Sequence, residues 1–245
     1  MLFSVMLVSC ATHYQVTGIT RTRLLVDSQY DVPASGQLAE MMRPYDHLVD
    51  SLMSPVLGQA AGYLEVNRPE SELTNLFSDI LMWSAQFYDE QPDFGIYNKG
   101  GIRASLAPGD ITKGDVLEMA PFNNYVSFVT LTGEKTMELM QQIAQRGGEG
   151  VSKEVRMVIS PDNQLKRVTV KGKEIDPQAS YRVVTIDYVS HGNDRLTAFK
   201  SATDRHDTTG EEDLSSSLIM RYIKDCTAKG RKVDAKIEGR IVVEE

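Results

Sequence analysis

The sequence contains few of the residues from which metal sites and disulfide frameworks are built. Its 245 residues include only four histidines and two cysteines, namely His13, His47, His191, His206, Cys10 and Cys226. Two cysteines are too few for a disulfide framework. None of the histidines stands in an Asp-x-His or Gly-Asn-His-Glu sequence, so no di-metal site with Asp, His and Asn ligands is predicted. No pattern of a Ser-His-Asp nucleophile or a phosphate-binding P-loop is recognisable either.

An excess of basic residues and a long apolar run are also missing. The formal net charge is −8 and the isoelectric point is about 5.1. These values argue against a general surface for nucleic-acid polymers, which would be basic, but not against one nucleotide in a local basic pocket. No run reaches the roughly 18 apolar residues of a membrane-spanning helix. With 41% hydrophobic and 24% charged residues, the composition is that of a globular protein with one large or two small domains.

The first ten residues differ from the rest because they are apolar and end in a cysteine. Residues 1–10 look like the core of a secretory signal, and Leu-Val-Ser-Cys at 7–10 resembles a bacterial lipobox. The resemblance implies that Cys10 is lipidated and anchors the protein to the bacterial cell envelope, in the periplasm or at the outer membrane. Cys226 would then be an unpaired, buried thiol. No Lys or Arg precedes the apolar run, and the alternative is an ordinary N-terminal segment.

The remaining chain divides into a polar extension at 11–37 and a domain at 38–245. In the first half, apolar spacing predicts helices over 38–53, 71–88, 111–119 and 134–145, and strands over 21–26, 56–66, 93–97 and 125–131. In the second half, short runs rich in β-branched residues predict strands over 155–159, 166–170, 181–186 and 237–243, a helix over 214–228 and a long irregular segment over 187–205. Alternating helices and strands with hairpin-like pairs indicate a layered α/β (α+β) domain with mixed β-sheets flanked by helices.

The end of the predicted strand 93–97 carries a candidate binding site. Asn98 is followed by Lys99, the pair Gly100 and Gly101, and two residues later by Arg103. Glycines let the backbone approach a ligand closely or take a positive φ, and exposed N–H groups in such a turn can bind an anion. An arginine can add a bidentate contact to a phosphate or carboxylate. The alternative for a bare Asn-x-Gly-Gly sequence is an ordinary tight turn.

The candidate binding site at 98–103 is one of several motifs that occur in order along the chain. The series runs from Arg-Pro-Glu-Ser-Glu-Leu-Thr-Asn-Leu at 68–76, through Asn-x-Gly-Gly-Ile-Arg at 98–103, Gly-Asp-Ile at 109–111 and Pro-Phe-Asn-Asn at 121–124, to residues 181–194 and Glu-Gly-Arg-Ile at 238–241. Together it resembles the C-terminal, substrate-binding domain of the bacterial and animal 5'-nucleotidases, a family that includes UDP-sugar hydrolases. The resemblance covers about residues 40–245.

The resemblance implies roles for particular residues. Phe122 and Tyr188 match the two aromatic side chains that sandwich a nucleobase, although Phe122 by itself also fits a core position. Asp194 matches the carboxylate that accepts hydrogen bonds from the ribose hydroxyls. Arg68 matches another phosphate-contacting arginine, with an offset of one or two residues, or is a solvated charge at a helix start. Asn123 bonds the base edge or only shapes its turn.

The family pattern after the second aromatic residue is Gly-Gly-Asp-Gly, whereas this chain has Gly-Asn-Asp-Arg at 192–195. Asn193 can still adopt a left-handed conformation. Arg195 is the larger departure, because its side chain can block the pocket, change its preference or add a phosphate contact. Asn75 and Asp79 also match polar positions of the family, and for them structural packing is the expected role.

The resemblance also implies what must be supplied from elsewhere. Full-length members carry a metallophosphoesterase domain with two divalent metal ions, and the sequence offers no ligand set for them. We therefore expect no metal or other cofactor on this chain, and a domain that recognises a nucleoside or nucleotide while a separate metallophosphoesterase chain provides the metals. The alternatives are a lipid-anchored nucleotide- or nucleoside-binding protein without a catalytic partner, and a degenerate domain that binds nothing.

Overall fold

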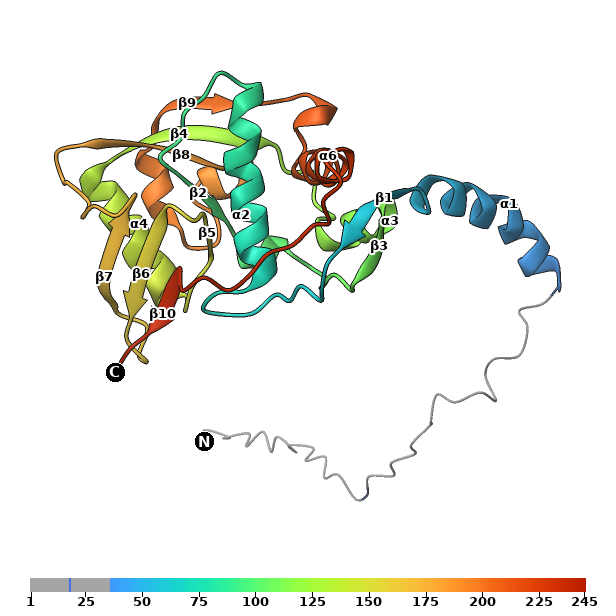
Figure 1. Ribbon diagram of the computed structural model, residues 1–245, viewed down its shortest axis with the longest axis horizontal. Coiled ribbons are helices and arrows are strands. Elements are labelled where there is room, and N and C mark those ends of the chain that lie inside the picture. The colour runs from blue at the N-terminus through green and yellow to red at the C-terminus, as the bar shows by residue number, and fades with distance from the viewer. Residues whose placement is uncertain (1–17, 19–35) are drawn as a thin grey trace, which may run out of the picture. The chain divides into compact units, whose positions relative to one another are not determined.

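The computed structural model describes Gly18 and residues 36–245 (Figure 1). The predicted signal segment with Cys10, the strand at 21–26 and most of the extension at 11–37 lie outside the described residues. Residues 47–245 form one compact unit. The first helix, α1 (Gly36–Met53), carries the predicted apolar stripe, and none of its side chains is buried. Among the described residues, no helix is long and apolar enough to cross a membrane.

The predicted α/β architecture with mixed sheets is confirmed. After α1 the helices are α2 (Glu72–Ser84), α3 (Lys113–Met119), α4 (Gly133–Gln145), α5 (Asp187–Ser190) and α6 (Ser215–Ala228). The strands are β1 (Val56–Ala60), β2 (Phe94–Tyr97), β3 (Gly109–Thr112), β4 (Val126–Thr132), β5 (Gly150–Val151), β6 (Val155–Ile159), β7 (Leu165–Val170), β8 (Ser180–Ile186), β9 (Thr203–Asp207) and β10 (Ile241–Val243). Within the described part of the chain these strands form three sheets, with the orders β1-β3, β10-β6-β7 and β5-β2-β8-β4-β9.

The five-stranded sheet determines where the candidate site residues meet. β2 and β8 are parallel neighbours, so their carboxyl ends lie at the same edge. β4 is antiparallel to β8, with Val126 opposite Ile186, so the amino end of β4 lies at that edge too. Three segments distant in sequence, 98–103, 121–125 and 187–194, therefore begin or end there. The edge at the carboxyl ends of parallel strands is a common location for ligand sites in α/β proteins.

The core is built from the apolar faces that the sequence pattern predicts. Helix α2 lies across the five-stranded sheet in contact with β2, β5 and β8 (Figure 1). Its stripe Leu73, Phe77 and Ile80 is buried. All four residues of β2 are buried, as expected for a strand covered on both faces. Cys226 on α6 is buried and unpaired, as predicted.

Several predicted segments differ from the structure. The segment 187–205, predicted to be irregular, contains α5, a 3-10 helix at Thr197–Ser201 and the start of β9. β9 has the sequence Thr-Asp-Arg-His-Asp, which carries no alternating apolar pattern because it is an exposed edge strand beside β4. The strand predicted over 56–66 ends at Ala60, and the helix predicted over 111–119 begins at Lys113 after β3. These are boundary errors, because short elements carry weak periodic signals.

Ser71 begins α2 and is completely buried. Its Oγ accepts the N–H of Thr74 at 3.3 Å, and its own N–H donates to Thr74 Oγ1 at 3.0 Å. We expect Ser71→Ala to lower the free energy of unfolding by about 1 kcal/mol, the usual cost of a lost helix cap. Urea denaturation measures it. Ser105→Ala, at an exposed serine, is the control, and equal losses in both variants would contradict the role of the cap.

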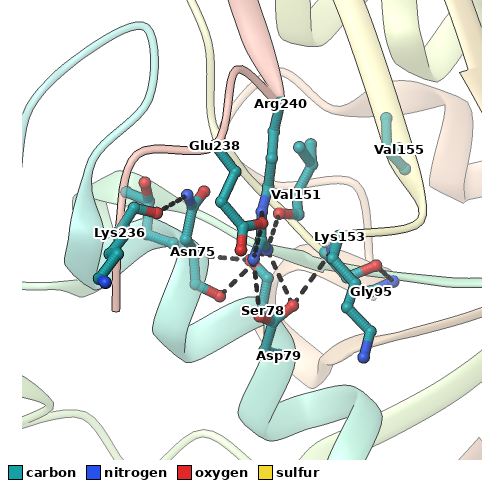
Figure 2. Close-up of polar contacts among 12 residues, drawn as sticks. Asn75, Ser78, Asp79, Gly95, Val151, Lys153, Val155, Lys236, Glu238 and Arg240 are labelled. Atoms are coloured by element: carbon teal, nitrogen blue, oxygen red, sulfur yellow. Dashed lines mark hydrogen bonds and ion pairs between the residues drawn. The ribbon is translucent and has the colours of Figure 1, made fainter. Parts of the chain in front are cut away.

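The C-terminal segment is tied to α2 by a buried cluster of polar groups (Figure 2). The Arg240 side chain is 2% exposed and forms a bidentate pair with Asp79, with Nη1–Oδ1 and Nη2–Oδ2 distances of 2.8 and 2.7 Å. Nη1 also donates to the carbonyl oxygen of Val151 at 2.9 Å. Buried Glu70 accepts the N–H groups of Glu238 and Arg240, both at 2.8 Å. Strand β10 thereby reaches its place beside β6.

The same cluster explains the two polar positions of α2 noted in the sequence. Asn75 is buried, and its Nδ2 donates to Glu70 Oε1 at 2.6 Å and to the carbonyl oxygen of Lys236 at 2.9 Å. Asp79 is the partner of Arg240. Asn75 and Asp79 therefore hold the C-terminal segment against α2, in agreement with the packing role expected for them.

Candidate functional site

The segment 98–103, which carries Asn98, the glycine pair and Arg103, follows β2 directly. Buried β2 delivers Asn98 to the sheet edge, and Lys99–Gly101 form a 3-10 turn. Neither Gly100 nor Gly101 has a positive φ, so that part of the expectation for the turn is wrong. Gly101 is instead required by close approach, because a Cβ at this position would lie 2.8 Å from Asn98 Oδ1 and 3.0 Å from the Tyr97 ring.

Asn98 and Asp194 are paired at the centre of the site. The Asn98 Nδ2 donates to Asp194 Oδ2 at 2.5 Å, and the Tyr188 hydroxyl donates to Asp194 Oδ1 at 3.4 Å. This bond fixes the orientation of the Asn98 amide, because the reverse orientation would turn its oxygen toward a carboxylate. The Asn98 Oδ1 is left buried without a hydrogen-bond partner. Buried acceptors are normally satisfied, and this one is enclosed beside Gly101.

Tyr188 and Asp194 stand on the segment that follows β8. Tyr188 lies in α5, and Asn193 Nδ2 donates to its carbonyl oxygen at 2.8 Å. Loss of solvation and the negative charge of Asp194 raise the pKa of the Tyr188 phenol, so it stays a neutral donor at neutral pH. The backbone is left-handed at Asp194 (φ 52°) and Arg195 (φ 60°) but not at Asn193, where the sequence favoured it. The left-handed position therefore falls partly on Arg195, where the family pattern has glycine.

A pocket of about 350 Å³ opens at this edge of the sheet. Its lining residues are Asn98, Gly100, Gly101, Arg103, Phe122, Asn124, Tyr188 and Asp194. The side chains of Phe122 and Tyr188 are 45% and 41% exposed, which is unusual for large apolar rings. The alternative of a core position for Phe122 is therefore wrong. Arg103 is exposed, and its Nη1 donates to the carbonyl oxygen of Gly100 at 3.3 Å, which leaves most of its donors available.

The structure brings most of the predicted site residues together, but three lie apart from the lining. Asn123 is exposed, and its neighbour Asn124 lines the pocket instead. Arg195 is exposed and is not part of the lining, so it does not close this pocket. Arg68 faces the segment after α4, where its Nε donates to the carbonyl oxygen of Gly148 at 2.8 Å and its Nη2 to Glu149 Oε1 at 2.6 Å.

Two charged residues near the pocket were missed by the sequence analysis. Arg146 closes α4, and its Nη2 lies 4.0 Å from Asp194 Oδ2. Its Nε donates to Glu149 Oε1 at 2.5 Å, and the Glu149 side chain is completely buried. Gly148, between them, has a φ of 105°, and a Cβ there would lie 2.2 Å from the carbonyl oxygen of Pro69. The one available signal was Arg-Gly-Gly-Glu at 146–149, which reads as an ordinary helix end.

The described residues offer no group of side chains that could bind a metal ion. Among the residues that the structure describes, no three His, Cys, Asp or Glu side chains are grouped so that they could hold a metal ion. The charged groups at the pocket are instead one carboxylate and one arginine, Asp194 and Arg103. With two exposed rings above them, this set suits a ligand with a flat face, hydroxyl donors and an anionic group.

The fold and the pocket together define a mixed α/β domain with an open pocket at one edge of its largest sheet. The chain belongs to the 5'-nucleotidase C-terminal domain family, because residues 56–201 match the family described as "5'-nucleotidase, C-terminal domain". The resemblance noted in the sequence is thereby confirmed.

Relatives with assigned names cover most of this chain but share only part of their own length with it. Protein UshA of Escherichia coli is 26% identical over 167 residues, which cover 67% of this chain and 30% of that protein. The 5'-nucleotidase of Vibrio cholerae is 27% identical over 200 residues, which cover 79% of this chain and 35% of that protein. The chain therefore spans about a third of the length of these relatives.

Solved structures agree with the sequence relatives. A 5'-nucleotidase precursor from Thermus thermophilus superposes with a TM-score of 0.73 at 29% identity, over 89% of this chain and 45% of that one. The NAD nucleotidase of Haemophilus influenzae matches with a TM-score of 0.62 at 18% identity, over 86% of this chain and 42% of that one, and supports the fold alone.

Proposed function

We propose that this domain binds a nucleoside or 5'-nucleotide in the pocket between Phe122 and Tyr188. The two half-exposed rings, which rise from different segments beside one pocket, are the observation that carries the proposal. Exposed aromatic rings beside a pocket suit a nucleobase, because every base presents a π-face. The pocket volume of about 350 Å³ falls at the lower end of the range for small-molecule sites, about 300–1,000 Å³.

The polar groups suit the rest of such a ligand. Asp194 lines the pocket and is an acceptor, as ribose hydroxyls require. Arg103 stands beside Gly100 and Gly101, where a 5'-phosphate would find a bidentate cation. Arg68 is engaged by Gly148 and Glu149 and would contact a phosphate only after leaving them.

Hydrolysis of the phosphate ester would need metal ions that a separate metallophosphoesterase chain supplies. The names of the relatives, 5'-nucleotidase among them, support this reaction class for the complete assembly. In that assembly the present chain recognises the substrate, and two metal ions activate the attacking water. For the location of the protein, we propose that a lipid on Cys10 anchors it to a bacterial envelope. The Leu-Val-Ser-Cys sequence at 7–10 supports this proposal.

Calorimetric titration of the full chain with adenosine, AMP and ribose 5-phosphate tests the proposal, with phosphate release followed in added Mn²⁺. We expect adenosine and AMP to bind, AMP more tightly, ribose 5-phosphate to bind weakly because it has no base, and no phosphate release from the chain alone. Added phosphoesterase chain should restore release. If adenosine and AMP bind no better than ribose 5-phosphate, recognition of the base is wrong. Binding that no phosphoesterase converts to turnover would favour a binding protein without a catalytic partner.

A further inference from the structure

A completely buried carboxylate lies behind the pocket without lining it. Glu149 Oε1 accepts from two arginines, Arg146 Nε at 2.5 Å and Arg68 Nη2 at 2.6 Å. Its other oxygen, Oε2, accepts the backbone N–H of Lys99 at 2.5 Å. A buried carboxylate is retained only when its oxygens are satisfied, and here two of its three partners, Arg146 and Lys99, lie next to residues of the site.

The bonds of Glu149 reach both members of the Asn98–Asp194 pair. The Lys99 N–H belongs to the turn that starts at Asn98, so Oε2 fixes the backbone next to Asn98. Through Oε1, Glu149 holds the guanidinium of Arg146, whose Nη2 is 4.0 Å from Asp194 Oδ2. Glu149 is thus connected to Asn98 through the adjacent backbone and to Asp194 through Arg146.

Asp194 needs such a support. It stands with Arg195 in a left-handed backbone conformation that non-glycine residues adopt at a cost. Its carboxylate is bonded to Asn98 Nδ2 and weakly to the Tyr188 hydroxyl. The orientation of the remaining lone pairs of Asp194 depends on its hydrogen bond with Asn98.

We propose that Glu149, acting through Arg146 and the Lys99 N–H, is a positioning residue that makes the pocket selective for a ligand with ribose hydroxyls. The inference rests on the proposed function, because it assigns a cause to the recognition of the sugar in that same pocket. Glu149 does not touch the ligand; it keeps the Asp194 carboxylate, which lines the pocket, facing donors on the sugar. The Arg146 guanidinium lies beside the negative charge of Asp194, with Nη2 4.0 Å from Oδ2.

The substitution that tests the inference is Glu149→Gln, which preserves volume. A glutamine side chain has one acceptor oxygen, whereas Glu149 uses two, one for the arginines and one for Lys99. One of the two connections is therefore lost. Arg146→Gln is the second variant. Arg146 lies at the end of α4, and its side chain is 20% exposed. This substitution removes the link between Glu149 and Asp194 but leaves the bond from Lys99 to Glu149 in place.

Glu90→Gln provides the matched control. Glu90 is also a largely buried carboxylate that binds an arginine, with Oε2–Nε and Oε1–Nη2 distances to Arg182 of 2.8 and 2.5 Å. It has no bond to a pocket residue. Its loss should lower thermal stability without changing the ratio of affinities for two ligands that differ in a hydroxyl.

The experiment is calorimetric titration of the full chain and the three variants with adenosine and 2'-deoxyadenosine, beside a thermal melt. In the wild type we expect adenosine to bind on the order of tenfold more tightly, the worth of a hydrogen bond to a charged group. Glu149→Gln and Arg146→Gln should reduce this ratio to about threefold or less, chiefly by weakening adenosine, whereas Glu90→Gln should retain it. If Glu149→Gln does not fold, Arg146→Gln decides the outcome.

The outcomes separate this inference from the proposed function. A wild-type ratio near one, or a ratio that survives in Arg146→Gln and in folded Glu149→Gln, would overturn the positioning role while adenosine still binds. A parallel fall for both nucleosides, with the ratio unchanged and the melting temperature lowered, would show a merely structural role and overturn it as well. Wild-type protein that binds neither nucleoside would overturn the proposed function itself.

Discussion

Replacing Phe122 and Tyr188 together by alanine is expected to weaken adenosine binding by about a hundredfold or more. Stacking on an aromatic ring contributes about 1–3 kcal/mol per base, so each substitution should cost about tenfold. Both rings are nearly half exposed, so their removal leaves no cavity in the core. The melting temperature should therefore change little. Titration of the single and double variants measures the effect.

Two controls make the aromatic prediction specific. Tyr63→Ala removes a ring that is 56% exposed but does not line the pocket, and it should leave adenosine binding unchanged. Tyr188→Phe keeps the stacking face and removes only the hydroxyl that reaches Asp194 at 3.4 Å, so it should lose much less than Tyr188→Ala. If the phenylalanine and alanine variants lost the same affinity, the ring of Tyr188 would not be a stacking surface.

Arg240→Met is expected to cause the largest loss of stability, about 3 kcal/mol. Removing one partner of a buried ion pair leaves the other without compensation, which commonly costs 3–5 kcal/mol. We expect the lower end, because Asp79 is 34% exposed and water can reach it. The carbonyl oxygen of Val151 also loses its donor. Urea or guanidinium denaturation gives the difference in the free energy of unfolding.

Arg156→Met on β6 is the matched control for this prediction. Arg156 is exposed and bonds to carbonyl oxygens of its own segment, so its substitution should change stability by less than about 0.5 kcal/mol. Adding Asp79→Leu to Arg240→Met should recover part of the loss, because an apolar pair can replace a buried ion pair. A similar loss for Arg240→Met and Arg156→Met would argue against the buried cluster as a source of stability.

The sequence predicted the parts of the site that follow from local patterns. A buried apolar strand followed by Asn98 and two glycines marks a turn at a sheet edge, and the ordered motifs identified the family. Phe122 and Tyr188 were assigned through that resemblance, because the residues around each ring do not reveal its exposure. The pairing of β2 with β8 then explains why segments 98–103 and 187–194 meet.

The parts that escaped prediction depend on contacts between distant residues. Glu149 meets Lys99 from 50 residues away and Arg68 from 81, and no periodic signal encodes such a meeting. Arg68 was matched to a phosphate-contacting arginine through the resemblance, with a solvated charge at a helix start as the alternative, and the sequence does not reveal its buried partner Glu149. The sequence favoured a left-handed backbone at Asn193, whereas the structure has it at Asp194 and Arg195. The path of the whole loop decides which residue takes this conformation, and the residue type only biases the choice.

The attachment of Arg240 to Asp79 has a consequence for the timing of folding during synthesis. Arg240 and its partner are separated by 161 residues, and β10 adds in parallel to β6, whose own hairpin with β7 forms from neighbouring sequence. While the ribosome still covers the last residues, Asp79 lacks its arginine partner and the Val151 carbonyl oxygen lacks the Arg240 donor. The hairpin of β6 and β7 can form earlier, since local contacts form before distant ones. A nascent chain stalled before Arg240 should therefore be protected from proteases at β6 and β7 but remain open around α2.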